Sequence, residues 1–130
     1  MGNLPPVLFS NRTILFYIMK PLTVEQAALI DQIHSALGCQ TQAAKEFIAV
    51  SLQDIILFDK KQSDYGSKNI ADFGTFGVIV RMNDKFQRIK NLITTKRKAR
   101  VKESVLDTMA DIANYAKIFR LLETGKWPNE

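Results

Sequence analysis

The segment from Thr41 to Lys60 constrains the fold more than any other part of the sequence, because it contains no residue that would break a helix. Its apolar side chains occupy most positions around a helix rather than a single stripe. They are Phe47, Ile48, Val50, Leu52, Ile55, Ile56, Leu57 and Phe58. A helix that is apolar on nearly all sides has to be covered on nearly all sides, so the pattern predicts a long helix in the centre of a bundle.

A shorter helix is expected before this segment. Thr23 and Gln26 have the spacing of a capping box, in which a hydroxyl and an amide side chain satisfy the first backbone groups of a helix. The helix should continue to about Leu37. Gly38 should then end it, because glycine adopts a positive φ at little cost.

The second half of the chain predicts two more helices. One covers residues 76–96, where apolar residues recur at helical spacing, although residues 78–80 alone are also compatible with a strand. The other runs from about residue 102 to residue 125. Turn-forming residues over 60–77 predict a long ordered loop between helices, and the basic run at 96–102 predicts a solvated connection.

These elements predict an all-α fold, a four-helix bundle with a short N-terminal extension. A chain of 130 residues suits one domain, here residues 19–130 after an extension over residues 1–18. Met19 precedes a clear helix start, which suggests that translation begins there. The apolar stretch before it is interrupted by Asn11 and Arg12 and falls short of the ~20 apolar residues of a membrane span.

Composition narrows the class of partner and the compartment. The formal net charge of +5 favours anionic partners such as nucleotides, nucleic acid or a membrane surface, without distinguishing among them. One cysteine, Cys39, cannot form an internal disulfide, and one histidine, His34, leaves no Cys/His zinc site, so a reducing compartment such as the cytoplasm is predicted. The interruption of the apolar stretch by Asn11 and Arg12 predicts no membrane association. The apolar second helix and the N-terminal extension offer more apolar surface than a small bundle buries, so a homo-oligomer is expected.

Cationic side chains lie beside the apolar stripe of the predicted third helix. Arg81, Asp84, Lys85 and Arg88 fall on one face at spacings of three, one and three. Arginine and lysine at the edge of a core are well placed to bind phosphate oxygens. The alternative is a surface pair between Asp84 and Arg88, but three cations to one acid favour an anionic ligand.

The segment from Lys61 to Gly66 offers further contacts for a nucleotide. Lys61 can contact a phosphate, Asp64 provides a carboxylate, and Tyr65 provides an aromatic surface for a base. A simple turn explains the same residues equally well. The glycines of this region match neither the dinucleotide-binding nor the Walker pattern, so the known phosphate loops are excluded.

Acidic residues form a stripe on the predicted last helix. Glu103, Asp107, Asp111 and Asn114 are spaced by four, four and three, which places them on one side at 3.6 residues per turn. Carboxylates stacked in this way suit magnesium, which prefers oxygen ligands and keeps substrate phosphates among them. The alternative is a solvated face opposite the apolar stripe of the same helix.

Four separated polar motifs follow one another in this half of the chain. They are Lys61-Gln62-Ser63-Asp64-Tyr65-Gly66, then Asn69 and Gly77, then Arg81-Met82-Asn83-Asp84-Lys85 with Arg88, and the run from Glu103 to Tyr115. In this order they resemble the nucleotide modification associated domain 1 family, which is largely phage-encoded. The similarity covers approximately residues 58–118. It implies a role in phage nucleotide metabolism or in handling modified or signalling nucleotides.

A more distant similarity is to the MazG-like all-alpha nucleotide pyrophosphatases. Those enzymes hold magnesium with a Glu-x-x-Glu pair on one helix and Glu-x-x-Asp on another. Here the last helix reads Glu-x-x-x-Asp-x-x-x-Asp, and Glu46, Asp54 and Asp59 of the second helix form no Glu-x-x-Glu pair. Because the acidic motifs differ from those of the MazG-like enzymes, nucleotide hydrolysis is kept as a hypothesis separate from nucleotide binding.

The leading prediction is a phage-type protein that binds a phosphorylated nucleotide, linear or cyclic, and sequesters it from host defence in the host cytoplasm. The predicted ligand-binding residues are Lys61, Tyr65, Asn69, Arg81, Lys85, Arg88, Asn114 and Tyr115. The alternative is a magnesium-dependent nucleotide pyrophosphohydrolase, with magnesium held by Glu103, Asp107, Asp111 and Asp64. Its catalytic residues are not assigned. Nucleic-acid binding by the basic run is the weaker alternative, because that run contains no aromatic residue.

Overall fold

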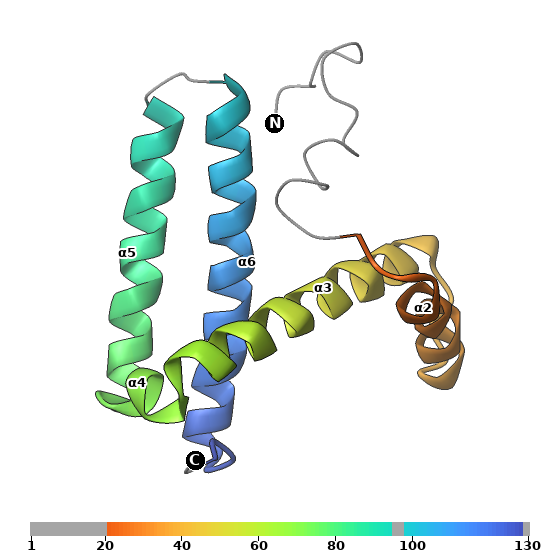
Figure 1. The fold of residues 1–130 in the computed structure, drawn as a ribbon, viewed down its shortest axis with the longest axis horizontal. Coiled ribbons are helices and arrows are strands. Elements are labelled where there is room, and N and C mark those ends of the chain that lie inside the picture. Colours follow the sequence, from red (N-terminus) through yellow and green to blue (C-terminus); the bar gives the residue numbers. More distant parts are fainter. Residues whose placement is uncertain (1–20, 95–97, 129–130) are drawn as a thin grey trace. The chain divides into compact units, whose positions relative to one another are not determined.

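The structure is a computed structural model that describes residues 21–94 and 98–128, with the helix alone and no side chains over 98–103 (Figure 1). The helices in these ranges are α2 (Val24–Ala36), α3 (Gln42–Tyr65), α4 (Ser67–Ala71), α5 (Gly74–Thr94) and α6 (Lys98–Glu123). The same ranges contain no β-strand, and the helices pack as in a bundle, so the all-α prediction is confirmed. The expected extension over residues 1–18 lies outside the described residues. None of the described helices is long and apolar enough to cross a bilayer.

The contacts of the chain divide it into two compact units, Met1–Ile55 and Ile56–Glu130. The first unit contains α2 and most of α3. The second unit contains the last turns of α3 and all of α4, α5 and α6.

The predicted limits of α2 are confirmed. The backbone N–H of Gln26 donates to the Thr23 hydroxyl over 3.1 Å, and the Thr23 N–H donates to the Gln26 side chain over 2.9 Å, which completes the capping box. At the other end Gly38 has a φ of 69°, and the next N–H donates to the carbonyl of His34 over 3.0 Å. This is the glycine-terminated geometry that the sequence predicts.

The expectation of a central α3 is wrong for the first unit. Only Ile48 and Asp54 of this helix are buried, and Phe47 is 75% exposed. Among the described residues of the unit, α2 is the one other helix. A single neighbour leaves most of the circumference of α3 uncovered, however apolar its sequence is.

The expectation of a long loop over residues 60–77 is also wrong. Helix α3 continues to Tyr65, α4 follows directly, and α5 begins at Gly74. The turn formers act only at the joints, where Gly66 has a φ of 73° and Gly74 a φ of 61°. Lys68 and Asn69 are exposed residues of α4, so their polarity marks the solvated side of a helix rather than a loop, whereas Ser67 of the same helix is buried.

Helices α5 and α6 form an antiparallel pair at the centre of the second unit (Figure 1). Val78 and Ile89 of α5 and Ala110 and Ile118 of α6 are the buried apolar residues of this pair. Val78 is completely buried, and residues 78–80 are helical rather than extended. The helical interpretation of the sequence over this segment is therefore confirmed.

Helix α6 begins at Lys98, four residues earlier than predicted, so most of the basic run belongs to a helix and not to a connection. Lysine, alanine and arginine are good helix formers, which is why the charge run does not interrupt the helix. The predicted end is confirmed, since Gly125 has a φ of 68° and the N–H of Lys126 donates to the carbonyl of Leu121 over 2.8 Å.

The C-terminal Trp127 attaches the end of the chain to the second unit. Its indole N–H donates to the carbonyl oxygen of Ser67 at the start of α4 over 3.0 Å. Its ring contacts Phe58 of α3 edge to face, with ring centroids 6.2 Å apart. These two contacts fix α3 and α4 against the residues that follow α6.

Candidate functional site

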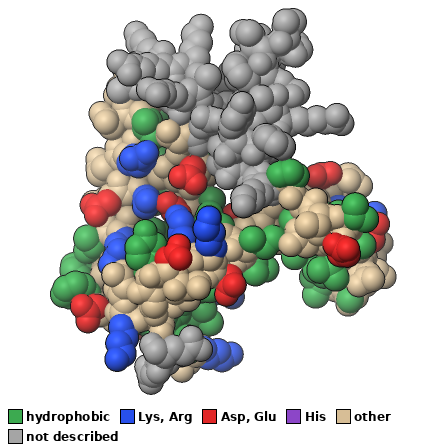
Figure 2. Space-filling view, in the orientation of Figure 1, with side chains coloured by type: hydrophobic (Ala, Val, Ile, Leu, Met, Phe, Trp, Pro, Cys, Tyr) green, Lys and Arg blue, Asp and Glu red, His purple; other side chains and the backbone are tan. Residues whose placement is uncertain are grey.

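A pocket of about 380 Å³ lies within the second unit, where the end of α3, the start of α4, and helices α5 and α6 meet. Its volume is in the range of small-molecule sites. The lining residues are Phe58, Lys61, Gln62, Tyr65, Gly66, Asn69, Ile70, Arg81, Lys85, Asp111, Asn114, Tyr115 and Ile118. Lysine and arginine side chains lie beside acidic ones on the surface over α5 and α6 (Figure 2).

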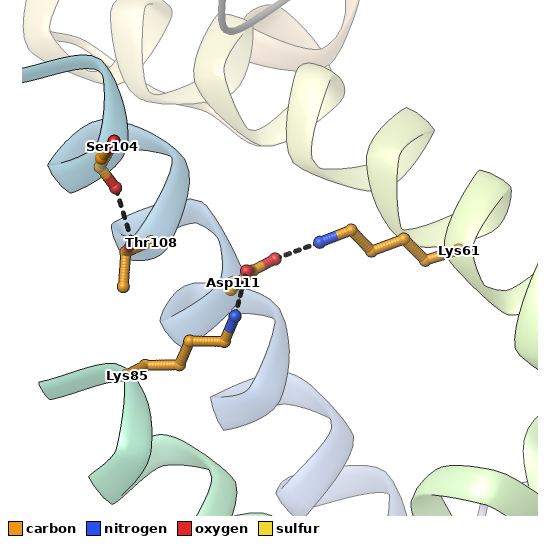
Figure 3. A network of polar contacts seen from close by, with 5 residues as sticks. All are labelled: Lys61, Lys85, Ser104, Thr108 and Asp111. Carbon is orange, nitrogen blue, oxygen red and sulfur yellow. Dashed lines mark hydrogen bonds and ion pairs between the residues drawn. The ribbon is translucent and has the colours of Figure 1, made fainter. Parts of the chain in front are cut away.

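Asp111 of α6 joins two lysines from two other helices inside this pocket. Lys61 of α3 donates to Oδ1 of the carboxylate, and Lys85 of α5 donates to Oδ2 over 2.8 Å. The two ammonium groups approach the carboxylate from opposite sides (Figure 3). Three helices are thus connected by one carboxylate with only 9% of its side chain exposed.

Electrostatics keeps this network charged. Burial opposes the charged form of Lys61, but the hydrogen bond and the charge of Asp111 outweigh it and raise the pKa of the lysine. Burial also opposes the charged form of Asp111, but the hydrogen bonds and charges of Lys61 and Lys85 outweigh it and lower the pKa of the carboxyl. Lys61 and Asp111 are therefore both ionised at neutral pH.

Arg81 provides a third cation one helical turn before Lys85. Its Nη2 lies 3.4 Å from the carbonyl oxygen of Asn69 and 3.3 Å from the Oδ1 of the same residue. These long hydrogen bonds orient the guanidinium toward α4 and leave most of its five donors for another partner.

Aromatic and amide side chains line the remainder of the pocket. Tyr65 is 69% exposed at the end of α3, Tyr115 lies half-buried on α6, and Asn114 beside it is buried. The Nε2 of Gln62 is buried and has no hydrogen-bond partner among the described residues. A buried amide donor without a partner is costly, so a ligand acceptor in the pocket would stabilise it.

The structure brings together seven of the eight predicted ligand-binding residues. They are Lys61, Tyr65, Asn69, Arg81, Lys85, Asn114 and Tyr115. Arg88, the eighth, is exposed and does not line the pocket. These seven residues line the same pocket, and the binding of a ligand by them stays a prediction.

The predicted magnesium ligands are placed differently from one another. Asp111 lies in the pocket, Asp64 and Asp107 are exposed outside its lining, and the side chain of Glu103 is outside the described part of the chain. Where side chains are described, no three His, Cys, Asp or Glu residues lie close enough together to hold a metal ion. The magnesium site accordingly stays a prediction.

Two features of the pocket were not foreseen from the sequence. One is Gln62, which directly follows Lys61 on α3, about 100° around the helix, so both side chains can reach the same pocket. The pairing of Asp111 with lysines 50 and 26 residues away in the chain leaves no local signal at all. The stripe pattern placed Asp111 among acids, whereas the fold places it among cations.

The comparisons with known proteins concern the segment that builds this pocket. Residues 61–123 match the family model of nucleotide modification associated domain 1. The resemblance inferred from the polar motifs is thereby confirmed over this range. Except for Phe58, every lining residue of the pocket lies within the nucleotide modification associated domain 1 segment. The similarity to MazG-like pyrophosphatases is not shown, and neither a curated protein nor a solved structure matches the chain.

Proposed function

We propose that the pocket of the second unit binds a phosphorylated nucleotide. The observation that carries this proposal is the convergence of Lys61 and Lys85 on Asp111, with Arg81 one turn away, in a cavity that tyrosines also line. Clustered cations attract phosphates, and aromatic rings provide stacking surfaces for bases. The description of the matched family, which concerns nucleotide modification, supports the same class of ligand.

Each group of lining residues has a role in this proposal. Lys61, Lys85 and Arg81 contact phosphate oxygens through charge-assisted hydrogen bonds. Tyr65 and Tyr115 contact the base, and the side-chain amides of Asn69, Asn114 and Gln62 hydrogen-bond to the sugar or the base edge. The three amides come from three helices, Gln62 from α3, Asn69 from α4 and Asn114 from α6.

Binding without turnover is the better supported form of the proposal. As a magnesium-dependent hydrolase the protein would use Asp111 as a metal ligand, yet both oxygens of that carboxylate accept hydrogen bonds from lysines. If the protein is phage-encoded, as the resemblance implies, binding alone would withdraw a nucleotide signal from host enzymes. We therefore place sequestration ahead of pyrophosphohydrolysis.

One experiment tests the proposal and separates the two mechanisms. The protein is incubated with candidate nucleotides, with and without magnesium, and is then recovered, denatured and analysed for the small molecules that it releases. Release of the intact nucleotide supports binding, and release of a hydrolysis product supports the enzyme. The Lys85→Gln variant should release neither, whereas Lys90→Gln, on the same helix but outside the pocket, should behave as the wild type. Equal recovery from both variants would remove the pocket from consideration.

A further inference from the structure

The positive charge of the pocket is concentrated at one point. Lys61 and Lys85 bind the two oxygens of a single carboxylate, so their ammonium groups lie within reach of one small anion. A chain of several phosphates would require a row of cations along its length. In Figure 3 the Asp111 carboxylate occupies the space between the two ammonium groups, so one ligand anion can contact both lysines only from beside this carboxylate.

The ammonium groups have donors left for that anion. Each carries three N–H groups, and one from each lysine is engaged by Asp111. The remaining donors can bind a phosphate group while the carboxylate stays in place. Asp111 thus keeps the two lysines together and reduces their combined charge.

The charges of the lining residues indicate how much negative charge the position matches. Three cations, Lys61, Arg81 and Lys85, and one carboxylate, Asp111, leave two positive charges among the lining residues. Asp107 acts on Lys61 from outside the lining and can only reduce this number. A phosphate monoester carries about 1.5 to 2 negative charges at neutral pH, all on the oxygens of one phosphate group. A cyclic phosphodiester has one fewer ionisable oxygen, and a triphosphate has additional charged groups that these residues leave unmatched.

From this match of position and charge we propose that the ligand is a nucleoside monophosphate, whose terminal phosphate lies beside Asp111 and contacts the remaining donors of Lys61 and Lys85. The proposal rests on the nucleotide-binding function proposed above and specifies its ligand class. Arg81 contacts the outer side of the same phosphate or the adjoining sugar oxygen. The nucleoside extends toward Tyr65 and Tyr115.

Asp111 is then a determinant of phosphate number. Its replacement by asparagine removes one negative charge from the lining and raises the net charge from two to three. The variant should favour a diphosphate relative to a monophosphate when compared with the wild type. The Lys61→Gln variant changes the net charge in the opposite direction and should favour a cyclic monophosphate in relative terms.

Titration calorimetry on the full chain tests the inference. For each common base, the ligands are the nucleoside and its monophosphate, cyclic monophosphate, diphosphate and triphosphate. Each titration is done once with a chelator and once with magnesium. We expect the monophosphate to bind at least about tenfold more tightly than the nucleoside or the cyclic form, and more tightly than the triphosphate. Tighter binding of the triphosphate or of the cyclic form would overturn the monophosphate assignment and leave nucleotide binding intact. If no nucleotide binds, both proposals fail.

The two charge variants complete the test. Circular dichroism first establishes that each variant is folded, and the measured quantity is the ratio of affinities for monophosphate and diphosphate, which a general loss of binding does not change. Asp111→Asn should shift this ratio toward diphosphate by several-fold, and Lys61→Gln should shift it the other way. Asp84→Asn, an exposed change on α5 outside the pocket, is the matched control. An unchanged ratio in both folded variants would overturn the charge-matching argument.

Discussion

Lys85 Nζ lies 2.8 Å from Oδ2 of Asp111, and this contact joins α5 to α6 at the position where Lys61 of α3 joins them as well. The carboxylate has two oxygens, and each accepts from a different helix. Three of the helices that line the pocket are therefore connected through one side chain. The consequences for stability and for binding can be measured separately.

The stability of the second unit should depend on pH through this network. The pKa of Asp111 is lower in the folded than in the unfolded protein, so its contribution is complete above about pH 4 and is lost as the pH falls through the lowered pKa. The pKa of Lys61 is raised, so its contribution is complete below about pH 10 and is lost as the pH rises through the raised pKa. The network stabilises the fold between these limits.

Asp111→Asn is the variant that measures this contribution. We expect a loss of about 1–3 kcal/mol in the free energy of unfolding at neutral pH, because two lysines lose a charged partner. In urea denaturation the difference from wild type should shrink well below about pH 4, where the native carboxyl is also protonated. Asp84→Asn, on the exposed side of α5, controls for a general change in net charge. A difference that stays constant with pH would contradict the electrostatic explanation.

The cations of α5 should differ in their importance for binding. Arg81 lines the pocket and Arg88 does not, although the sequence places both on one face of the helix. Charge-assisted hydrogen bonds contribute about 1.5–3 kcal/mol each, so Arg81→Ala and Lys85→Ala should each weaken nucleotide binding roughly ten- to a hundredfold. Arg88→Ala should weaken it much less.

Titration calorimetry measures these affinities, and a thermal melt of each variant separates lost binding from lost folding. Lys85→Arg is the finer probe, because it retains the charge and changes the donor geometry. If Arg81→Ala and Arg88→Ala lose the same affinity, the cations act through a general electrostatic field and the pocket geometry is not responsible.

Local signals predicted three helix ends, both ends of α2 and the C-terminal end of α6. The capping box at Thr23 and the glycines at 38 and 125 act through backbone groups only a few residues away, and the structure confirms each of them. The apolar spacing of α5 was equally informative, since it resolved residues 78–80 as helix. In each case the residues whose interaction decides the structure lie within one or two helical turns of each other in the sequence.

Non-local relationships were not predictable in the same way. The apolar surface of α3 predicted a central position. Within the described part of the first unit only α2 accompanies it, and the sequence of α3 contains no sign of this. The density of turn-forming residues over 60–77 predicted one long loop, whereas the structure has helices joined at Gly66 and Gly74. Serine, asparagine and aspartate also occur in helices, so their presence alone does not decide between the two. The pairing of Asp111 with Lys61 depends on how α3 and α6 pack, which no spacing within either helix records.

Magnesium should have little effect on nucleotide affinity if the lysines neutralise the phosphate. Affinities measured with a chelator and with magnesium should then agree within about threefold, which is less than a tenfold step of 1.4 kcal/mol. A strong magnesium dependence that disappears in Asp111→Asn would instead assign this carboxylate to the metal, as the acidic stripe of α6 suggests. Asp107→Asn would then be the next variant to examine, because Asp107 is one turn away on the same helix.

Self-association is expected from the first unit. Phe47 is 75% exposed, Leu37 70% and Val24 86%, and apolar surface of this extent favours association. Light scattering should show a mass greater than that of one chain. Phe47→Lys should reduce the measured mass, whereas Gln42→Lys, at an exposed position on a different side of α3, should not. A monomeric wild type would contradict the prediction.

Trp127 should stabilise the pocket although it does not line it. Its indole N–H bonds to Ser67, and its ring contacts Phe58, which does line the pocket. Trp127→Ala should destabilise the second unit by about 1–3 kcal/mol, less than the loss of a fully buried tryptophan because the side chain is half-buried. Trp127→Phe retains a ring but removes the N–H, so it should recover part of the loss. Trp127 is also the one tryptophan of the chain, and its fluorescence should report ligand binding through Phe58. If Trp127→Ala melts as the wild type does, the attachment of the C-terminal end contributes nothing to the fold, and the position of Phe58 has to be explained by α3 alone.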